Sequence, residues 1–423
     1  MTVWKTWSFG ALDAGITSLY GVGGTPPERG IVRWKHRYTT VDYPPVALYE
    51  LAAAGAVYRA LVPDYHDSRW LNAAMKLPGL LAEILLALLV WRVWRQKWSE
   101  RAATYATLAV WLNPAMILAG PVLGYLDPLM ALPAIGAILA AFEGRALLAG
   151  ALFALACLTK AQAVFIGPVV ALATWNASRG GARVARGLCG FGAVTAGAIA
   201  PYVAAGAGRN MLQGVGSLLR HDMLSGDAAN VWWVVTYVLR AIYAVADLGL
   251  WGAWTMQVRI LGITQIVKLG YPNPRLLASA AVVAAAAWAV WTVRRDTRAS
   301  ALFACGAFIM HAYFVLGVQV HENHLYLAVP LLALASATRP GLAPVLTAVS
   351  GVFALNLFLF FGIGRGFPLP PRNLTVIDTT VLLAIANTGL LVWHARRFRA
   401  AVALEEAADE TAVHLEGRPS YVR

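Results

Sequence analysis

Long apolar runs, separated by short polar segments, dominate this sequence. Most runs are about 17 to 22 residues long, which suits a helix that crosses the roughly 30 Å hydrocarbon core of a bilayer. They lack the strict polar–apolar alternation of membrane-barrel strands. The pattern predicts an all-α, polytopic membrane protein with about thirteen transmembrane helices. The runs begin near Leu71, Ala103, Pro128, Leu147, Ala163, Leu188, Val231, Trp251, Leu276, Ala301, Leu325, Leu342 and Val376.

Composition agrees with a lipid environment, and charge indicates how the chain is oriented in it. Of the 423 residues, 59% are hydrophobic and 13% are charged, whereas about a quarter of an ordinary soluble domain is charged. The net charge of +13 comes largely from basic loops, which remain on the cytoplasmic side of a membrane. We therefore expect no nucleic-acid partner. The loops expected on that side are residues 92–101, 179–186, 294–298 and 396–399.

Three regions follow from this pattern. Residues 1–70 are predicted to form an external loop with interfacial helices, 71–394 the transmembrane domain, and 395–423 a cytoplasmic tail. Within the first region, residues 46–62 resemble a span but are interrupted by Glu50 and by an arginine. We expect this segment to lie in the membrane interface, where its tyrosines are favoured. The three cysteines lie in apolar segments without metal-ligand spacing, so we expect no metal and no cofactor.

A carboxylate beside two prolines is the first candidate for chemistry. The segment "RYTTVDYPPVALYE" places Asp42 and Tyr43 before Pro44 and Pro45. Prolines stiffen the backbone, so this segment offers a rigid mount for a carboxylate. The alternative interpretation is that Asp42 caps the following helix, which the prolines start.

Two further polar sites interrupt apolar sequence. Asp127 precedes a proline in "GPVLGYLDPLM", and the residues alone favour a helix cap there. Lys160 and Gln162 interrupt an apolar stretch in "LTKAQA", where a charge costs about 2.5 to 3.5 kcal/mol on insertion scales. Such a cost predicts a partner for Lys160, for which an anionic phosphate is a candidate. The alternative is a lysine that extends to the interface. Whether residues 147–175 form one long helix or two with a polar break is left open.

Two loops later in the chain hold the remaining candidates. "VQVHENHLYLAVP" contains His321, Glu322 and His324, which suit phosphate binding or proton handling; a metal site lacks a third ligand, and interfacial anchoring is the alternative. "RHDMLSGDAANVWW" contains Arg220 and Asn230 ahead of two tryptophans, including Trp232. These tryptophans fit either an interfacial belt or stacking on a sugar ring. Counting spans from the basic loops places all these candidates on the external face.

Taken in order, these segments resemble the C-type glycosyltransferase superfamily, and within it the dolichyl-phosphate-glucose-dependent glucosyltransferases. "VDYPP" is similar to the family's Asp-Tyr-Pro-Pro in the first external loop, and "KAQ" is similar to its Lys-Gln. "DAANVWW" resembles its Asp-x-Val-Ala-Asn-Phe-Trp, and "VHEN" its Val-His-Glu-Lys. Each motif is short, but together they extend from Asp42 to His324 in the family's order.

The sequence departs from the family pattern at three places. Asp127 lies where the family has Gly-His-Phe-Gln, and Asn323 replaces a lysine, which predicts a different donor or acceptor. The family's first helix and the early acidic residue that usually serves as catalytic base have no counterpart after Met1. We therefore expect either that the natural chain starts upstream or that it is shortened.

The resemblance implies a metal-independent bacterial hexosyltransferase of the plasma (inner) membrane, with its site on the periplasmic face. It would transfer a sugar, with inversion, from a polyprenyl-phosphate donor to a lipid-linked or cell-envelope glycan. Asp42 would assist the base or position the acceptor, and Glu322 would orient His321. The departing phosphate would be stabilised by His321 and by two of the substrate-binding residues, Lys160 and Arg220. The other residues expected to bind substrate are Tyr43, Asp127, Gln162, Asn230, Trp232 and His324. The alternatives are a secondary transporter and a catalytically incomplete homologue.

Overall fold

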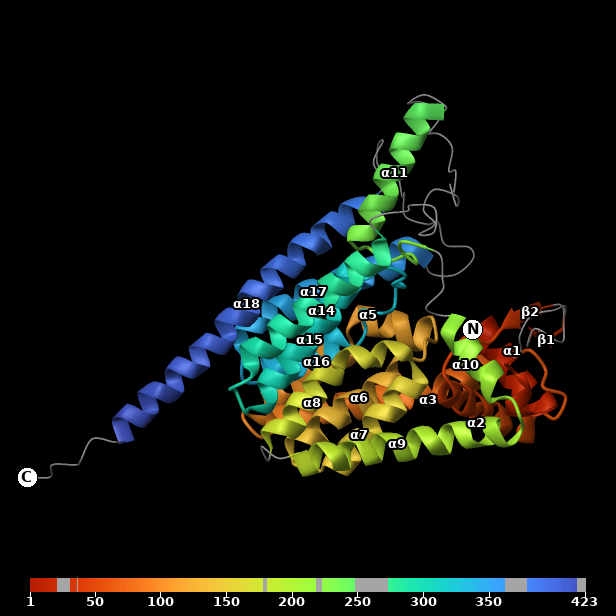
Figure 1. Cartoon of the computed structure of the whole chain (residues 1–423), viewed down its shortest axis with the longest axis horizontal. Helices are drawn as coiled ribbons and strands as arrows, with labels where there is room; N and C mark the ends of the chain where they lie inside the picture. The colour runs from red at the N-terminus through yellow and green to blue at the C-terminus, as the bar shows by residue number, and fades with distance from the viewer. Residues whose placement is uncertain are drawn as a thin grey trace, which may run out of the picture.

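The computed structural model describes residues 1–20, 31–35, 37–177, 181–217, 223–247, 273–361 and 379–416. These residues are helical almost throughout, apart from one hairpin of two short strands (Figure 1). The first half contains α1 (Thr2–Gly10), β1 (Ile31–Trp34), β2 (Arg37–Thr40), α2 (Pro45–Leu61), α3 (Arg69–Arg95), α4 (Glu100–Trp111), α5 (Pro114–Ile117), α6 (Asp127–Phe142), α7 (Ala146–Thr159), α8 (Gly167–Asn176), α9 (Gly181–Ala204) and α10 (Gly208–Ser217). The second half contains α11 (Val231–Asp247), α14 (Pro274–Val293), α15 (Ala299–Leu316), α16 (Ala328–Ser336), α17 (Ala343–Phe361) and α18 (Thr379–Glu416).

Among the described residues, five helices are long and apolar enough to cross a membrane: α3, α9, α14, α15 and the segment Pro340–Phe360 that contains most of α17. A sixth candidate is the pair Glu100–Trp111 and Pro114–Val122, whose halves are bent by 42°. The predicted membrane class and helical fold are confirmed in this coarser form, whereas the expected number of about thirteen spans is not. The expected run near Trp251, and the start of the one near Val376, lie outside the described residues.

Several predicted spans are helices that are shorter than a bilayer requires. The runs near Pro128, Leu147 and Ala163 correspond to Asp127–Phe142, Ala146–Thr159 and Ala161–Asn176. The last two are separate helical segments, because Lys160 between them has an extended backbone with φ −145° and ψ 125°. The stretch 147–175 is therefore interrupted by a polar break.

Local sequence explains where many helices begin. The side chains of Ser68, Ser99, Asn113 and Asn273 accept hydrogen bonds from backbone N–H groups in the first turns of α3, α4, α5 and α14. Such caps satisfy donors that the first turn of a helix cannot pair internally. Proline follows the cap in α5 and α14 and occupies the first turn of α2, α6 and α8, where its missing N–H is harmless.

Glycine allows α7 and α9 to pack closely. A Cβ atom on Gly150 would lie 1.8 Å from the Gly187 carbonyl oxygen, and one on Gly190 would lie 2.0 Å from the Leu147 carbonyl oxygen. Small residues at a helix interface let backbones approach in this way, and they are typical of membrane helix pairs. This contact fixes α9 along α7, and α7 carries the site described below.

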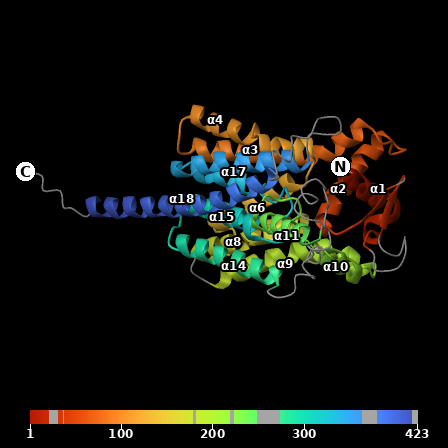
Figure 2. The same ribbon diagram turned by 90° about the horizontal axis from the view of Figure 1, so that it is seen from above.

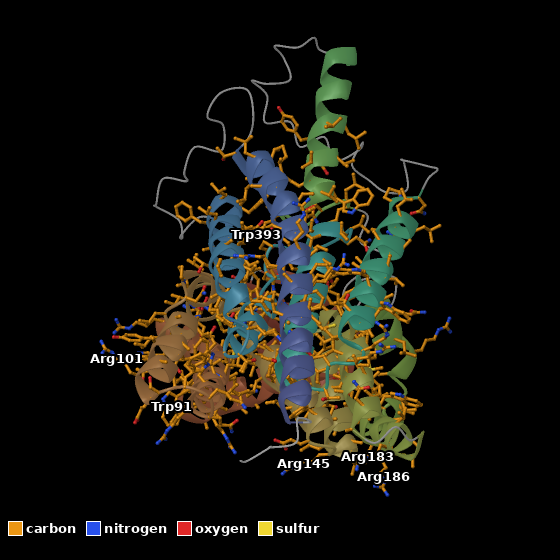
Figure 3. All side chains as sticks on the ribbon, turned by 90° about the vertical axis from the view of Figure 1, so that its left-hand side faces the viewer. Trp91, Arg101, Arg145, Arg183, Arg186 and Trp393 are labelled. Atoms are coloured by element: carbon orange, nitrogen blue, oxygen red, sulfur yellow. The ribbon has the colours of Figure 1, made fainter. Side chains whose placement is uncertain are left out.

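The basic turns lie together at one end of the helix bundle. Asn176 at the end of α8 donates to the Arg294 carbonyl after α14 at 3.4 Å. Arg339, between α16 and α17, is buried, forms an ion pair with Asp296 and donates to the Ala401 carbonyl at 2.8 Å. Figure 3 views this end and shows the labelled arginines directed away from the bundle: Arg101, Arg145, Arg183 and Arg186.

The N-terminal elements cover the other end of the bundle (Figure 2). The expected interfacial helix is α2, which begins at Pro45; its depth in a membrane remains a prediction. The hairpin β1–β2 was not predicted from the sequence. Its strands pair with Ile31 opposite Thr40 and turn at Lys35, whose φ of 56° is left-handed. The predicted C-terminal tail continues α18 as far as Glu416 (Figure 1).

Candidate functional site

A buried carboxylate at the start of α6 gathers four hydrogen bonds from distant segments. Lys160 Nζ donates to both Asp127 oxygens, at 2.9 and 2.8 Å. Gln162 Nε2 donates to Asp127 Oδ1 at 2.9 Å, and Asn323 Nδ2 donates to Oδ2 at 2.7 Å. Asp127, Lys160, Gln162 and Asn323 are called the Asp127 cluster below. The structure thus brings into direct contact three residues predicted from two separate motifs and the asparagine that replaces the family's lysine.

Helix ends place the cluster opposite the basic turns. Asp127 is the first residue of α6, which ends at Phe142, just before the turn with Arg145. Helix α7 runs back from that turn and ends at Thr159, so Lys160 returns to the level of Asp127. The backbone of Lys160 is extended, which ends α7, and its side chain reaches the carboxylate of Asp127 at the start of α6. The sequence prediction that basic loops and polar candidates occupy opposite ends agrees with this geometry.

Burial decides between the interpretations that the sequence leaves open. Asp127 is 0% exposed and Lys160 is 3% exposed, so the lysine does not extend to the interface. The side chain of Asp127 is not a helix cap either, because Leu126 occupies the N-cap position and no side chain caps α6. The favoured capping interpretation was therefore wrong. The partner of Lys160 is Asp127, and two neutral amides complete the shell that a buried ion pair requires.

Aromatic rings surround the ammonium group of the cluster. Lys160 Nζ lies 5.8 Å from the ring centroid of Tyr43 and 5.9 Å from that of Tyr125, distances at which a cation is attracted to a ring face. Trp4 and Trp7 of α1 pack against the Tyr43 ring, at centroid distances of 5.1 and 5.4 Å. The segment before α2 and helix α1 therefore form one wall of the site.

A second carboxylate lies beside the first in the loop between α15 and α16. Tyr125 OH donates a short hydrogen bond to Glu322 Oε1, and His321 Nδ1 lies 3.8 Å from Glu322 Oε2. Burial raises the pKa of Glu322 to about 7, although the Tyr125 hydrogen bond opposes the shift. Glu322 can therefore hold or release a proton near neutral pH. The Glu322–His321 distance is longer than a hydrogen bond, so the predicted orienting role of Glu322 remains a prediction.

The two histidines of this loop occupy different surroundings. The His321 side chain is 37% exposed, whereas His324 is held by Tyr313, whose hydroxyl lies 2.9 Å from His324 Nδ1. Burial and the charge of Lys160 keep the pKa of His324 well below its usual range. His324 is thus a neutral hydrogen-bonded side chain, and His321 is the histidine that a substrate can reach.

The loop before α11 pairs with the histidine loop. Gly226 N donates to the Val320 carbonyl at 2.8 Å, and a Cβ atom on Gly226 would lie 2.7 Å from His321 Nδ1. A larger residue at this position would therefore require the His321 side chain to shift. Asn230 Oδ1 accepts from Trp233 N at 2.9 Å, and its amide donates to the Gly317 carbonyl at 3.2 Å. Asn230 therefore holds the start of α11 against the end of α15.

The tryptophan of the predicted binding set has a structural contact. Trp232 Nε1 donates to the Leu316 carbonyl at 2.7 Å, which fixes α11 to α15. Arg220, expected to bind the departing phosphate, lies outside the described residues.

Asp42 lies near the cluster and does not cap α2, because Pro44 occupies the N-cap position of that helix. Burial, followed by the charges of Asp127, Asp42 and Glu322, raises the pKa of Tyr43 well above its usual value. The three predicted carboxylates therefore act on one tyrosine.

No family model matches the chain, and no curated protein matches it. The motif resemblance therefore remains a prediction.

Sequence reasoning missed two residues of the site and one beside it. Tyr125 contacts Glu322 and flanks Lys160, and its position two residues before Asp127 was the available signal. Asn323 was noted only as a departure from the family motif. Glu50 was treated as an interruption of an apolar run, but it accepts a hydrogen bond from Thr159, the residue before Lys160.

Proposed function

We propose that this protein is a membrane glycosyltransferase that moves a hexose from a polyprenyl-phosphate donor to an acceptor hydroxyl, with inversion. The observation that carries the proposal is the convergence of motif residues between positions 43 and 323 on Lys160 and Asp127, at the bundle end opposite the basic turns. Ordinary helix packing does not require a lysine, two carboxylates and a histidine at one point, because burying charges is costly.

The chemistry of transfer explains the residue types. The leaving group is a lipid phosphate that gains negative charge as its bond to the sugar breaks, and fixed positive groups stabilise that charge. Lys160 is held by Asp127, and an arriving phosphate would share the ammonium group with it. His321 is exposed enough to reach the phosphate, and Glu322, with its pKa of about 7, lies beside it. Tyr43 adds an aromatic ring beside the ammonium group, and a sugar can stack on such a ring.

The proposal includes a location. With the basic turns on the cytoplasmic side, as arginine-rich loops prefer, the Asp127 cluster would lie at the periplasmic face of the plasma membrane. The acceptor would then be a lipid-linked or cell-envelope glycan, and the lipid part of the donor would remain in the bilayer.

A proton-coupled secondary transporter is the second candidate, and one observation favours it. The Asp127–Lys160 pair is almost fully buried, and ionisable residues inside membrane proteins often pair with one another and take part in proton relays of transporters. A transporter would carry a labelled solute into liposomes and would leave polyprenyl-phosphate sugars intact.

The test uses the purified protein in lipid nanodiscs with radiolabelled glucose or mannose on undecaprenyl phosphate. A lipid extract from the organism's own membranes supplies the acceptor. We expect transfer by the wild type and a loss of about 100-fold in His321→Ala, the scale of a lost charge-stabilising or acid–base group. His66→Ala, an exposed histidine, is the matched control and should keep full activity. Absence of transfer from both donors, or equal transfer by His321→Ala, contradicts the proposal.

A further inference from the structure

Helix α2 holds a carboxyl group with one unpartnered oxygen. Thr159 Oγ1 donates to Glu50 Oε1 at 3.0 Å, which fixes the orientation of the group. Glu50 Oε2 is shielded from solvent and has no hydrogen-bond partner among the residues that the structure describes. Buried polar atoms in folded proteins are almost always paired, and the exceptions are frequently functional. This oxygen is therefore positioned to accept a hydrogen bond from a ligand.

The position of Glu50 relates it to the Asp127 cluster. Its anchor, Thr159, is the last residue of α7, and Lys160 follows directly. Tyr43, whose ring flanks Lys160, lies just before α2 on the same segment of chain. From the α2 side, Tyr43 thus flanks Lys160 and Glu50 contacts the residue that precedes it. Glu322 and Asn323 approach the cluster from the loop between α15 and α16.

Three other carboxylates of the region are already engaged. Asp127 accepts from Lys160 and from two amides. Glu322 accepts from Tyr125 through one oxygen, and its other oxygen is directed at His321. Glu83 of α3 accepts from Tyr326 at 2.9 Å. Among these carboxyl groups, Glu50 is the one with a buried oxygen left for a substrate.

The raised pKa of Glu50 suits a group that takes up a proton. Burial raises its pKa to about 8, and the hydrogen bond from Thr159 opposes the shift only in part. Helices α1, α3 and α7 pack against α2, and three lysines on or directly after these helices have partners of their own. These pairs are Lys5 with Asp67, Lys76 with the Val122 carbonyl, and Lys160 with Asp127.

We infer that Glu50 binds the acceptor hydroxyl through Oε2 and takes its proton during transfer; the inference rests on the proposed function. The acceptor oxygen forms a bond to the anomeric carbon while its proton passes to the Glu50 carboxylate. The bond from that carbon to the phosphate oxygen breaks, and its electron pair leaves with the lipid phosphate. Glu50, now a carboxylic acid, returns the proton to water.

The test compares Glu50→Gln and Glu50→Asp with wild type in the transfer assay described above. Glu83→Gln is the matched control, because Glu83 is also a buried carboxyl group that accepts from a hydroxyl. Replacing a general base typically costs between about 100-fold and 10,000-fold in rate. We expect such a loss in Glu50→Gln, partial activity in Glu50→Asp, and wild-type activity in Glu83→Gln. Donor binding, measured by retention of labelled donor on the protein, should remain in all variants.

A pH profile separates a proton acceptor from a structural residue. The reaction needs the carboxylate, so the wild-type rate should rise with pH up to about 8 and then level off. The residual rate of Glu50→Gln should lose this rise. Transfer by Glu50→Gln within tenfold of wild type, or an unchanged pH profile, overturns this inference and leaves the proposed function intact. Absence of transfer by the wild type overturns the proposed function and this inference with it.

Discussion

Removing the ammonium group of Lys160 should destabilise the protein strongly at pH 7 and much less at pH 5. In Lys160→Met, the carboxylate of Asp127 keeps only the amides of Gln162 and Asn323. Breaking a buried ion pair by removing one partner costs about 3 to 5 kcal/mol, because it leaves an uncompensated charge.

Protonation of the Asp127 carboxylate sets an upper limit on that loss of stability. The carboxylate can escape by taking up a proton, which for an ordinary aspartic acid costs about 4 kcal/mol at pH 7. This route becomes cheaper by about 1.4 kcal/mol for each unit of lowered pH. The folded variant then binds a proton that its unfolded chain does not bind, so its stability relative to wild type increases as pH falls. We expect a loss of about 4 kcal/mol at pH 7 and about 1.5 kcal/mol at pH 5.

The measurement is equilibrium unfolding in mixed detergent micelles, followed by tryptophan fluorescence at both pH values. Lys97→Met is the matched control, because Lys97 lies exposed in the turn after α3; a surface change of this kind stays within about 0.5 kcal/mol. The double variant Asp127→Asn with Lys160→Met has no lone carboxylate, so its loss should not vary with pH. An equal loss at pH 7 and pH 5 in the single variant, or a loss no larger than that of Lys97→Met, would refute the reasoning.

Two further predictions concern the loops around the cluster. Glu322 binds a proton more tightly when folded, so wild-type stability should fall as pH rises from about 4.5 to about 7. Glu322→Gln lacks this loss, and its melting temperature relative to wild type should rise across the same window; a constant difference would show that Glu322 does not titrate there. Asn230→Ala removes both the hydrogen bond to Trp233 and the one to Gly317, and should lower stability by about 1 to 3 kcal/mol. Thermal unfolding measures both losses. Ser99→Ala removes a single exposed helix cap, so it should lower stability less than Asn230→Ala does; a larger loss in Ser99→Ala would contradict this account.

Much of the fold followed from patterns that are local in the sequence. Apolar runs located the helices, and arginine-rich turns identified the end of the bundle to which they belong. The cost of burying Lys160 correctly predicted that it has a partner. The candidate partner named from the sequence was a phosphate, whereas the partner within the protein is Asp127. The relevant contact joins Lys160, directly after α7, to Asp127, the first residue of α6, at the end of both helices opposite the turn that connects them. Nothing in either motif specifies that the start of α6 and the end of α7 lie side by side.

The remaining differences have similar physical causes. Asp127 before Pro128 has the local sequence of a helix cap, and only tertiary donors draw its carboxylate away from the backbone. Tyr125 carries no charge, so its position two residues before Asp127 was the only signal in the sequence; its contact with Glu322 is visible only in the fold. The hairpin near Lys35 is made of short strands among aromatic and basic residues, where β-propensity depends on context. Hydropathy detects burial in lipid, but it does not detect which polar atoms meet.

Hydrogen bonds buried in the bundle explain how loops can hold the site precisely. Asn356 of α17 donates to the Glu322 carbonyl at 3.1 Å and accepts from Ala229 N at 2.7 Å. Asn387 of α18 donates to the Ala229 carbonyl at 2.8 Å, and its oxygen lies 3.0 Å from His311 Nε2. The nitrogen of the Asn387 side chain donates to Ala229, so its oxygen is the atom that faces His311. An amide oxygen only accepts hydrogen bonds, and His311 therefore carries a proton on Nε2. A buried network is stabilising only while every member is paired. Moving the loop before α11 would therefore break bonds to α17 and α18 together, and the loops at the site move only if the helices behind them move.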